Sequence, residues 1–331
     1  MDIVNGKASF IIPHWRNENI ISKVYFDKAI ESIFNQTDDN WEIIIIDGCS
    51  PSMEVKEYLQ KLERSYPERI KVIFEVKNNG AGFSRNIGIR HAYEQHSPIV
   101  LFLDADDVSH HRRLEMVRKI FMEEPDTGVV YSSFRVINEN GDYSSETSLT
   151  PSIREILDSH HNNPPEGKYA WITIGTETGF TNLPSATSVR TELAYKYPFP
   201  QSPVAEDGNT WFRYSADEMG GFRFCAEVPS LYRIPSNTGS VSRAKIMNFY
   251  RIKADTETDG FNAALEIALS NGSIKPDEKD DLFIRFYLKL AETVFKENES
   301  DLAFELLGKA RAISESKTQY HMENHNYKLG N

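Results

Sequence analysis

The first half of the chain alternates short apolar runs with stretches whose apolar residues recur at helical spacing. The runs are rich in Ile, Val and Phe, as buried parallel strands are. Strands and helices in this alternation form a mostly parallel sheet covered by helices, because each helical crossover returns the chain to the same end of the sheet. The sequence therefore predicts a doubly wound α/β fold. The predicted strands are Ala8–Ile12, Trp41–Ile46, Ile70–Phe74, Ile99–Leu103 and Gly128–Tyr131.

The pattern changes after about residue 138. Residues 140–168 are polar and rich in Pro, His and Asn, which predicts a loop-like segment. The histidine pairs at 110–111 and 160–161 are expected to be solvated. From about residue 247 the chain is predicted to be helical. Between residues 168 and 247, the sequence contains strand patterns at 185–189, 222–227 and 230–234 and a helix pattern at 207–217.

Composition excludes several classes of protein. The 331 residues include 49 acidic and 37 basic side chains, a formal charge of −12, which argues against a nucleic-acid binder. With only two cysteines, Cys49 and Cys225, no disulfide framework can form. No apolar run approaches the ~20 residues that span a bilayer, and the N-terminus lacks the pattern of a signal peptide. We expect a cytoplasmic protein without a transmembrane segment, with peripheral contact at the inner face of a membrane left open.

Three carboxylates follow the fourth predicted strand, in the run Leu103-Asp104-Ala105-Asp106-Asp107. Carboxylate oxygens are hard ligands of the kind that Mg²⁺ and Mn²⁺ prefer. In an open α/β sheet, ligands bind beyond the carboxyl ends of the strands, where this run lies. The run is therefore a candidate metal site. The alternative is a solvated turn that caps the next helix, for which Ser109 is the predicted N-cap.

Polar turns also follow the first three predicted strands, and all four turns are expected to meet at one edge of the sheet. Pro13-His14-Trp15 ends the first strand and Asp47-Gly48-Cys49-Ser50 the second. Asp47 can accept the N3–H of a uracil ring, and His14 or Trp15 can pack on the base.

The turn after the third strand is rich in glycine and runs through Gly80 to Arg85. Gly80 permits close approach of the backbone to a ligand, and Arg85 offers a forked cation to a nucleotide. The alternative is that each turn is merely structural, but the four together in this order are harder to explain that way.

Together these motifs resemble the family 2 glycosyltransferases, inverting enzymes of the Rossmann-like GT-A fold. The resemblance covers residues 8–245 and implies a mostly parallel sheet flanked by helices. We expect a catalytic domain at 1–245, with a nucleotide-binding half at 1–138 and an acceptor half at 139–245. A C-terminal helical region follows at 246–331. The matching runs are Ile12-Pro13-His14-Trp15, Asp47-Gly48-Cys49-Ser50, Asn79-Gly80-Ala81-Gly82-Phe83-Ser84-Arg85-Asn86 and Leu103 to Asp107.

The resemblance also implies roles for individual residues. Asp106 is the principal ligand of Mn²⁺ or Mg²⁺, and Asp104 contacts the ribose or the metal. Ala205-Glu206-Asp207 resembles the family's Glu-Asp motif, which makes Asp207 the general base with Glu206 nearby. The alternative is that both carboxylates only complement a helix N-terminus. Pro13, His14, Trp15, Asp47, Gly80, Arg85 and Ala105 complete the candidate nucleotide-sugar site.

The chain departs from the family's pattern at two places. Trp15 and Arg16 replace the usual Tyr and Asn after the first proline, and Pro235 occupies the position of a histidine that contacts metal or diphosphate in many members. Downstream, a lid over the phosphates and an ordinary polar loop are both compatible with the sequence. The candidate lid residues are Asn237, Ser240, Arg243 and Lys245.

We therefore expect a metal-dependent transfer of a sugar from a nucleoside diphosphate, UDP above all, to a hydroxyl of a glycan, a lipid-linked glycan or another acceptor. One alternative is a sugar nucleotidyltransferase, although the turn after the first strand, at 13–17, lacks the glycines that class needs. Another is a non-catalytic nucleotide-sugar-binding or scaffold protein. Three roles are open for the C-terminal helices. They could form a homodimer, dock on a membrane complex or simply cover the core.

Overall fold

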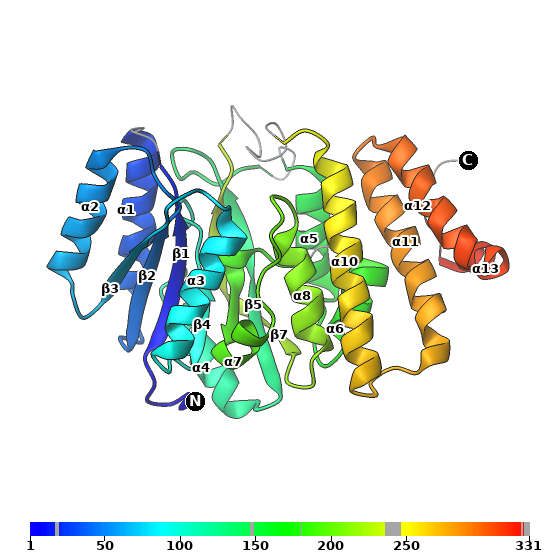
Figure 1. Ribbon diagram of the computed structural model, residues 1–331, viewed down its shortest axis with the longest axis horizontal. Helices are drawn as coiled ribbons and strands as arrows, with labels where there is room; N and C mark the ends of the chain where they lie inside the picture. Colours follow the sequence, from blue (N-terminus) through cyan, green and yellow to red (C-terminus); the bar gives the residue numbers. More distant parts are fainter. Residues whose placement is uncertain (17–19, 146–148, 180, 236–245, 326, 328–331) are drawn as a thin grey trace.

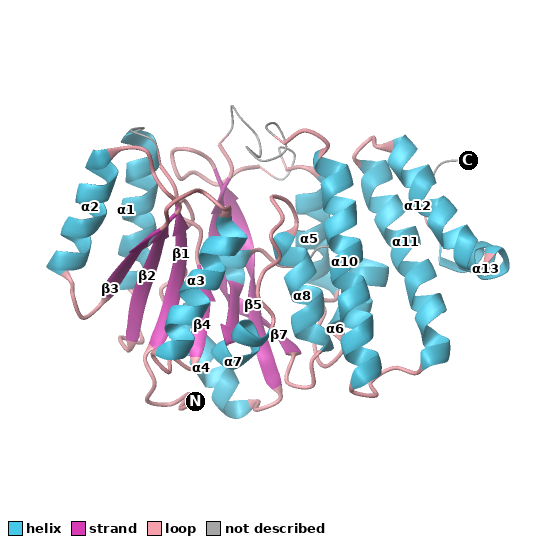
Figure 2. Cartoon of the chain, viewed as in Figure 1, coloured by secondary structure: helices cyan, strands magenta, loops and turns pink. Residues whose placement is uncertain are grey.

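The computed structural model describes residues 1–16, 20–145, 149–179, 181–235, 246–325 and 327. Within them, seven strands form one sheet in the order β3-β2-β1-β4-β6-β5-β7, with helices on both faces (Figures 1 and 2). This arrangement confirms the predicted mostly parallel α/β sheet. The strands are β1 (Ala8–His14), β2 (Trp41–Asp47), β3 (Ile70–Phe74), β4 (Ile99–Phe102), β5 (Thr127–Ile137), β6 (Thr187–Arg190) and β7 (Gly221–Arg233).

One strand runs against the rest of the sheet. β6 is antiparallel to both of its neighbours, β4 and β5, whereas every other pairing is parallel. β7 is a single strand where the sequence predicted two. Its register against β5 shifts between Ser132 and Phe134. Pro229 is tolerated there because β7 lies at the edge of the sheet.

Alternate residues of the strands supply two apolar layers. Ile43 and Ile45 of β2 pack into one cluster with α1, α2 and α4, while Ile44 and Ile46 pack into the other with α3, α7 and α8. Both faces of the central strands are therefore buried, as their continuous apolar runs predict. The helices are α1 (Ile20–Phe34), α2 (Met53–Ser65), α3 (Ala81–Glu94), α4 (Arg113–Glu123), α7 (Thr191–Lys196) and α8 (Glu206–Ala216).

The segment predicted to be loop-like contains a helix, α5 (Pro151–Asn162), followed by α6 (Ala170–Thr173). Proline suits the first turn of a helix, and Ile153 and Ile156 are buried at helical spacing, so a short amphipathic signal was present within the polar composition. His160 was expected to be solvated and is instead buried. Its Nε2 lies 2.7 Å from the Thr181 carbonyl and its Nδ1 lies 3.2 Å from the Ser133 hydroxyl.

The helix after the acidic run begins later than predicted. α4 begins at Arg113, and Ser109 is not its N-cap. Val108 pairs with Leu231 of β7 in an isolated bridge, which keeps the chain extended where the helix was expected. The acidic turn is thereby attached to the far edge of the sheet.

The C-terminal helices continue the core of the sheet (Figure 1). Phe261 of α10 is fully buried, and its ring lies 5.1 Å from that of Trp171, 5.6 Å from that of Phe212 and 4.2 Å from that of Phe286. One apolar cluster thus extends from the sheet to α12. The domain boundary expected near residue 245 stays a prediction. The helices are α10 (Phe249–Ser270), α11 (Lys279–Lys296), α12 (Ser300–Ile313) and α13 (Glu315–His325).

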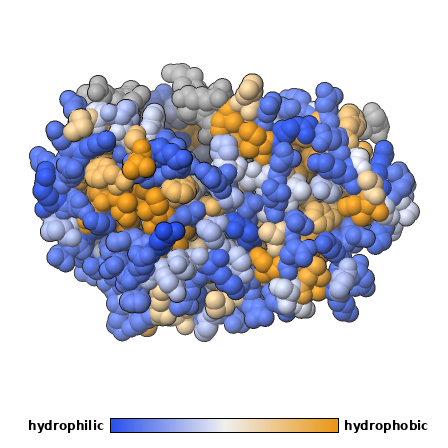
Figure 3. Space-filling view, in the orientation of Figure 1, coloured by the Kyte–Doolittle hydropathy of each residue, from blue (hydrophilic) through white to orange (hydrophobic). Residues whose placement is uncertain are grey.

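Short helical turns complete the described chain, a π-helix at Ile174–Thr178 and 3₁₀ turns at Pro184–Ala186 and Pro276–Glu278. None of the described helices combines the length and the apolar character needed to cross a bilayer. Apolar side chains gather at the surface in the region of β3 and α3 (Figure 3), where Phe74 and Phe83 are among the exposed large hydrophobic residues.

Because Phe261 joins the C-terminal helices to the sheet, we expect Phe261→Ala to lower the free energy of unfolding by about 3–5 kcal/mol. Urea denaturation followed by circular dichroism and by tryptophan fluorescence should give one coincident transition. Phe304→Ala is the matched control, since Phe304 is 57% exposed, and its effect should stay within about 0.5 kcal/mol. Two separate transitions would contradict a shared core.

Candidate active site

A cavity of about 790 Å³ opens at the carboxyl edge of the sheet. It is lined by the turns after β1 and β4, by the start of α3, and by residues of α5, α8 and α10. Most residues singled out from the sequence meet there. They are Pro13, His14, Trp15, Gly80, Arg85, Asp104, Ala105, Asp106, Glu206 and Asp207. The candidate lid residues Asn237, Ser240, Arg243 and Lys245 lie outside the described residues.

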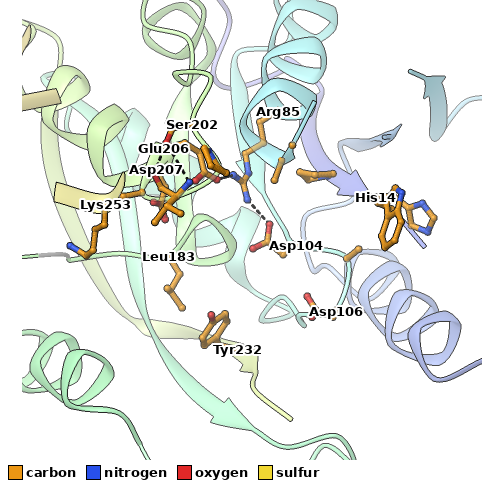
Figure 4. Close-up of a pocket in the computed structure, with 18 of the residues that line it drawn as sticks. His14, Arg85, Asp104, Asp106, Leu183, Ser202, Glu206, Asp207, Tyr232 and Lys253 are labelled. Carbon is orange, nitrogen blue, oxygen red and sulfur yellow. Dashed lines mark hydrogen bonds and ion pairs between the residues drawn. The ribbon is translucent and has the colours of Figure 1, made fainter. Parts of the chain in front are cut away.

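Arg85 connects the two acidic motifs (Figure 4). Its Nη2 lies 2.7 Å from Asp104 Oδ1 and its Nη1 lies 2.9 Å from Glu206 Oε1, although the two motifs are far apart in sequence. The guanidinium is buried, which alone would lower its pKa, but the charges of Asp104 and Glu206 raise that pKa above its usual value. The fork expected to bind a nucleotide thus holds two carboxylates of the protein itself.

The three carboxylates of the acidic turn lie in two different environments. Asp104 and Asp106 line the cavity, whereas Asp107 is fully buried and its Oδ1 accepts a hydrogen bond of 2.8 Å from the backbone N–H of Arg233. Asp107 thereby fixes the end of β7 against the turn. The Arg233 guanidinium adds a 2.8 Å hydrogen bond from its Nε to the Asp106 carbonyl.

The two cavity carboxylates suit a divalent cation. Desolvation by the surrounding cavity walls, and then the charge of Asp104, raise the pKa of Asp106 above the usual range of an aspartate. Such a pair is stabilised by an added cation. No group of three or more His, Cys, Asp or Glu side chains within the described residues is arranged to hold a metal. The pair therefore fits an ion that is completed by water and substrate phosphates, as Mg²⁺ commonly is.

Asp207 lies in the first turn of α8, directed there by an unusual backbone conformation. Ala205 precedes the helix with a φ of 56°, in the left-handed region that costs a residue with a side chain about 1–2 kcal/mol. Asp207 Oδ1 accepts a 2.8 Å hydrogen bond from the Gly208 N–H. Burial, and then the charge of Glu206, raise the pKa of Asp207 to about 8. The carboxylate thus shares the cavity with Asp104 and Asp106 and is held there as a stronger base than an ordinary aspartate.

The opposite end of the cavity is formed by the end of β1. His14 Nδ1 lies 2.9 Å from Asp47 Oδ1, and Asp47 also accepts hydrogen bonds from the Ser50 hydroxyl (2.5 Å) and N–H (2.9 Å). Burial would raise the pKa of Asp47, but the hydrogen bonds from His14 and Ser50 lower it, so the carboxylate is ionised. An ionised carboxylate only accepts hydrogen bonds, so His14 Nδ1 carries the hydrogen.

The expected contact of Asp47 with a base stays a prediction. Asp47 is fully buried and is not among the residues that line the cavity, and its oxygens accept hydrogen bonds from His14 and Ser50. His14 does line it, and its Nε2 is buried without a partner among the described residues. Arg16 also lines the cavity, and its Nη1 is buried without a hydrogen-bond partner among the described residues. Trp15 remains 53% exposed, available to a ligand at the rim.

The contribution of α10 was not predicted from the sequence. Lys253 and Glu257 line the cavity from this helix, and Lys253 lies on the same side as Asp207 (Figure 4). Their only signal in the sequence is a Lys and a Glu four positions apart, which is common on solvated helices. Their direction is set by how α10 packs on α8, which local patterns do not encode.

Comparisons with known proteins agree with this geometry. The family model described as Glycosyl transferase family 2 matches residues 9–219. An Escherichia coli protein, UDP-Glc:alpha-D-GlcNAc-diphosphoundecaprenol beta-1,3-glucosyltransferase WfgD, is 23% identical over 235 residues, covering 65% of this chain and 86% of that protein. The chain spans only about a fifth of the length of the first curated relatives it matches, glycosyltransferases from Rickettsia species.

Two solved structures share the fold. TarS from Staphylococcus aureus, in complex with UDP-GlcNAc, gives a TM-score of 0.55 at 18% identity over 97% of this chain and 91% of that one. The mannosyltransferase PcManGT from Pyrobaculum calidifontis, in complex with GDP-Man and Mn²⁺, gives a TM-score of 0.57 at 15% identity. The match covers 94% of this chain and 77% of that one. At these identities the likeness concerns the fold, and it confirms the predicted GT-A type.

Because the folded protein raises the pKa of Asp207 from 3.8 to about 8, folding keeps a proton that the unfolded chain loses in that window. Stability should therefore fall as pH rises from about 4 to 8. Asp207→Asn removes this titration. The free energy of unfolding of the variant, relative to wild type at the same pH, should therefore be highest above pH 8. Urea denaturation from pH 5 to 9 without added metal measures it.

Asp217, at the end of the same helix, is the matched control. Burial opposes its charge, but Lys196, the Met219 N–H and Tyr197 lower its pKa. The ionised form is thus stabilising, and Asp217→Asn should lose stability at neutral pH, with the loss fading as pH falls below about 4. Equal effects of the two substitutions would contradict the assigned pKa directions.

Proposed function

The chain belongs to glycosyl transferase family 2, and from that premise we propose that it is an inverting, metal-dependent enzyme. It would transfer a sugar from a UDP-sugar to a hydroxyl of a glycan, a lipid-linked glycan or another acceptor. The proposal rests on one observation. Asp207 and the pair Asp104 and Asp106 line one cavity, and Arg85 connects the two motifs within it.

Asp207 is the proposed base. It would accept the proton of the acceptor hydroxyl as that oxygen bonds to the anomeric carbon, on the face opposite the departing diphosphate. The electron pair of the broken C–O bond leaves with the diphosphate, so one displacement inverts the configuration. Glu206 is held by Arg85 and would act through its charge, which raises the pKa of Asp207.

Asp104 and Asp106 would hold Mn²⁺ or Mg²⁺, which supplies positive charge to the diphosphate as it leaves. The PcManGT complex with Mn²⁺ supports a divalent metal on this fold. At the far end of the cavity, His14 Nε2 would accept the N3–H of uracil, with Asp47 fixing the tautomer. Arg16 Nη1 would donate to a neighbouring carbonyl of the base.

The two alternatives differ in what they require. A sugar nucleotidyltransferase needs a Gly-rich phosphate loop after β1, and the turn at 13–17 contains no glycine. A scaffold needs no base, so the raised pKa of Asp207 beside two metal-type carboxylates would have no use. Catalysis is therefore the function that we test.

Asp207→Asn should lower kcat by about 10²–10⁴-fold, because it removes the general base but keeps the shape of the side chain. UDP release from a UDP-sugar in the presence of acceptor measures the rate, and calorimetry with UDP and Mn²⁺ measures binding. Binding should persist, since Asp207 is not a metal ligand in this proposal. An unchanged rate would exclude Asp207 as the base and favour another mechanism.

UDP with Mn²⁺ should raise the melting temperature. At 100 times the dissociation constant, a ligand adds about 2.7 kcal/mol of stability. UDP, GDP, CDP and dTDP are compared by thermal shift with Mn²⁺ and with EDTA. We expect the UDP shift to disappear with EDTA and to shrink in Asp106→Asn. An EDTA-resistant shift of equal size would contradict metal dependence.

A further inference from the structure

The acceptor end of the cavity is built partly by α10, which lies outside the segment that matches the family model. Phe249, Lys253 and Glu257 line the cavity from this helix. In Figure 4, Lys253 lies on the side of Glu206 and Asp207, and His14 lies on the other side of Asp104 and Asp106. The helix therefore borders the space in which an acceptor must approach Asp207.

Lys253 and Glu257 form a close ion pair on the cavity wall. Lys253 Nζ lies 2.5 Å from Glu257 Oε1, and the two side chains are only 19% and 9% exposed. Removing such charges from water is unfavourable, and buried ion pairs are weak sources of stability. A pair of this kind at the wall of a cavity suits ligand binding, because the ammonium has three donors and the carboxylate has spare lone pairs.

The pair is fixed relative to the catalytic helix. The Thr256 carbonyl accepts a 2.8 Å hydrogen bond from Asn209 Nδ2, and the Thr256 hydroxyl lies 2.8 Å from that of Ser202. Gly260 packs against Asn209 so closely that an added Cβ would lie 2.6 Å from the Asn209 Cα. Asn209 follows Asp207 in α8, so the position of the ion pair is coupled to that of the proposed base.

We propose that Lys253 and Glu257 select a pyranose as the acceptor, by binding two neighbouring hydroxyls of its ring. The inference rests on the proposed transfer function and specifies its acceptor. The ammonium would donate to one hydroxyl oxygen and the carboxylate would accept from the next. Ile153, Ile156 and Leu183, which line the same cavity, would pack against the C–H groups of the sugar.

Other acceptor classes fit these side chains less well. An aliphatic alcohol offers one hydroxyl and would leave one member of the ion pair without a ligand partner while excluding water from it. An anionic acceptor would meet Glu206, Asp207 and Glu257 at this end of the cavity, and the single ammonium of Lys253 does not outweigh three carboxylates. A neutral ring with adjacent hydroxyls, each both donor and acceptor, satisfies both charges.

The test measures acceptor KM and nucleotide affinity separately. UDP-glucose, UDP-galactose and UDP-N-acetylglucosamine are each offered with Mn²⁺ and a panel of p-nitrophenyl pyranosides, with long-chain alcohols and glycerol phosphate as non-sugar acceptors. Lys253→Met and Glu257→Gln should raise the KM of the pyranoside by about 10- to 100-fold, the effect of losing a hydrogen bond to a charged group. The Kd of UDP with Mn²⁺, measured by calorimetry, should stay within about twofold of wild type.

Arg251→Met is the matched control, because Arg251 also lies on α10 but forms an exposed ion pair with Glu305 of α12 and does not line the cavity. It should leave the pyranoside KM unchanged, which separates the loss of a local contact from a general effect on α10. The inference is overturned if the two cavity variants keep the wild-type KM, if they weaken UDP binding to the same degree, or if wild type transfers only to non-sugar acceptors. Failure of wild type to bind any nucleotide with Mn²⁺ would instead overturn the proposed function.

Discussion

The buried guanidinium of Arg85 is the interaction on which the site depends. It neutralises Asp104 from the turn after β4 and Glu206 from the start of α8, two carboxylates that would otherwise repel each other across the cavity. A lysine could not replace it, since a single ammonium lacks the fork that reaches both partners. Because Arg85 is buried and both of its terminal nitrogens are paired, its guanidinium holds the two acidic motifs at a fixed separation. The positive charge needed by a diphosphate must then come from a source other than Arg85, such as a metal ion or the lining residues Arg16 and Lys253.

A balance of opposing effects tunes Asp207. Its place in the first turn of α8 favours the charged carboxylate, as does Arg85, whereas burial and the neighbouring Glu206 favour the protonated form. Burial and Glu206 dominate, so the folded chain favours the protonated form of Asp207, and the carboxylate binds a proton more tightly than an ordinary aspartate does. The left-handed backbone of Ala205 is also unfavourable, and it directs the first turn of the helix at the cavity.

The sequence predicted those parts of the molecule that local pattern controls. The apolar runs predicted the central strands, and the polar turns at their ends predicted the cavity edge with Asp104 and Asp106. Asp207 was identified only by the resemblance of Ala205-Glu206-Asp207 to a family motif. The errors have a common cause in contacts between distant segments. His160 is buried because its ring forms hydrogen bonds with the Thr181 carbonyl and the Ser133 hydroxyl, and Ser109 fails as a cap because Val108 pairs with β7. The pairing of Arg85 with carboxylates of its own chain was likewise not predicted. The ion pair on α10 was invisible because its spacing suits any solvated helix.

The reversed direction of β6 has a further consequence. Since β6 runs against its neighbours, its beginning lies at the cavity edge, where the Ser185 hydroxyl accepts a hydrogen bond from the Asp104 N–H. The stretch that joins β5 to β6 therefore leaves the sheet and re-enters it at the same rim. Within this excursion, Ile153 and Ile156 of α5 line the cavity, whereas Trp171 packs in the shared core. Changes at the lining positions can therefore reshape the rim around a substrate without disturbing the packing that supports the sheet.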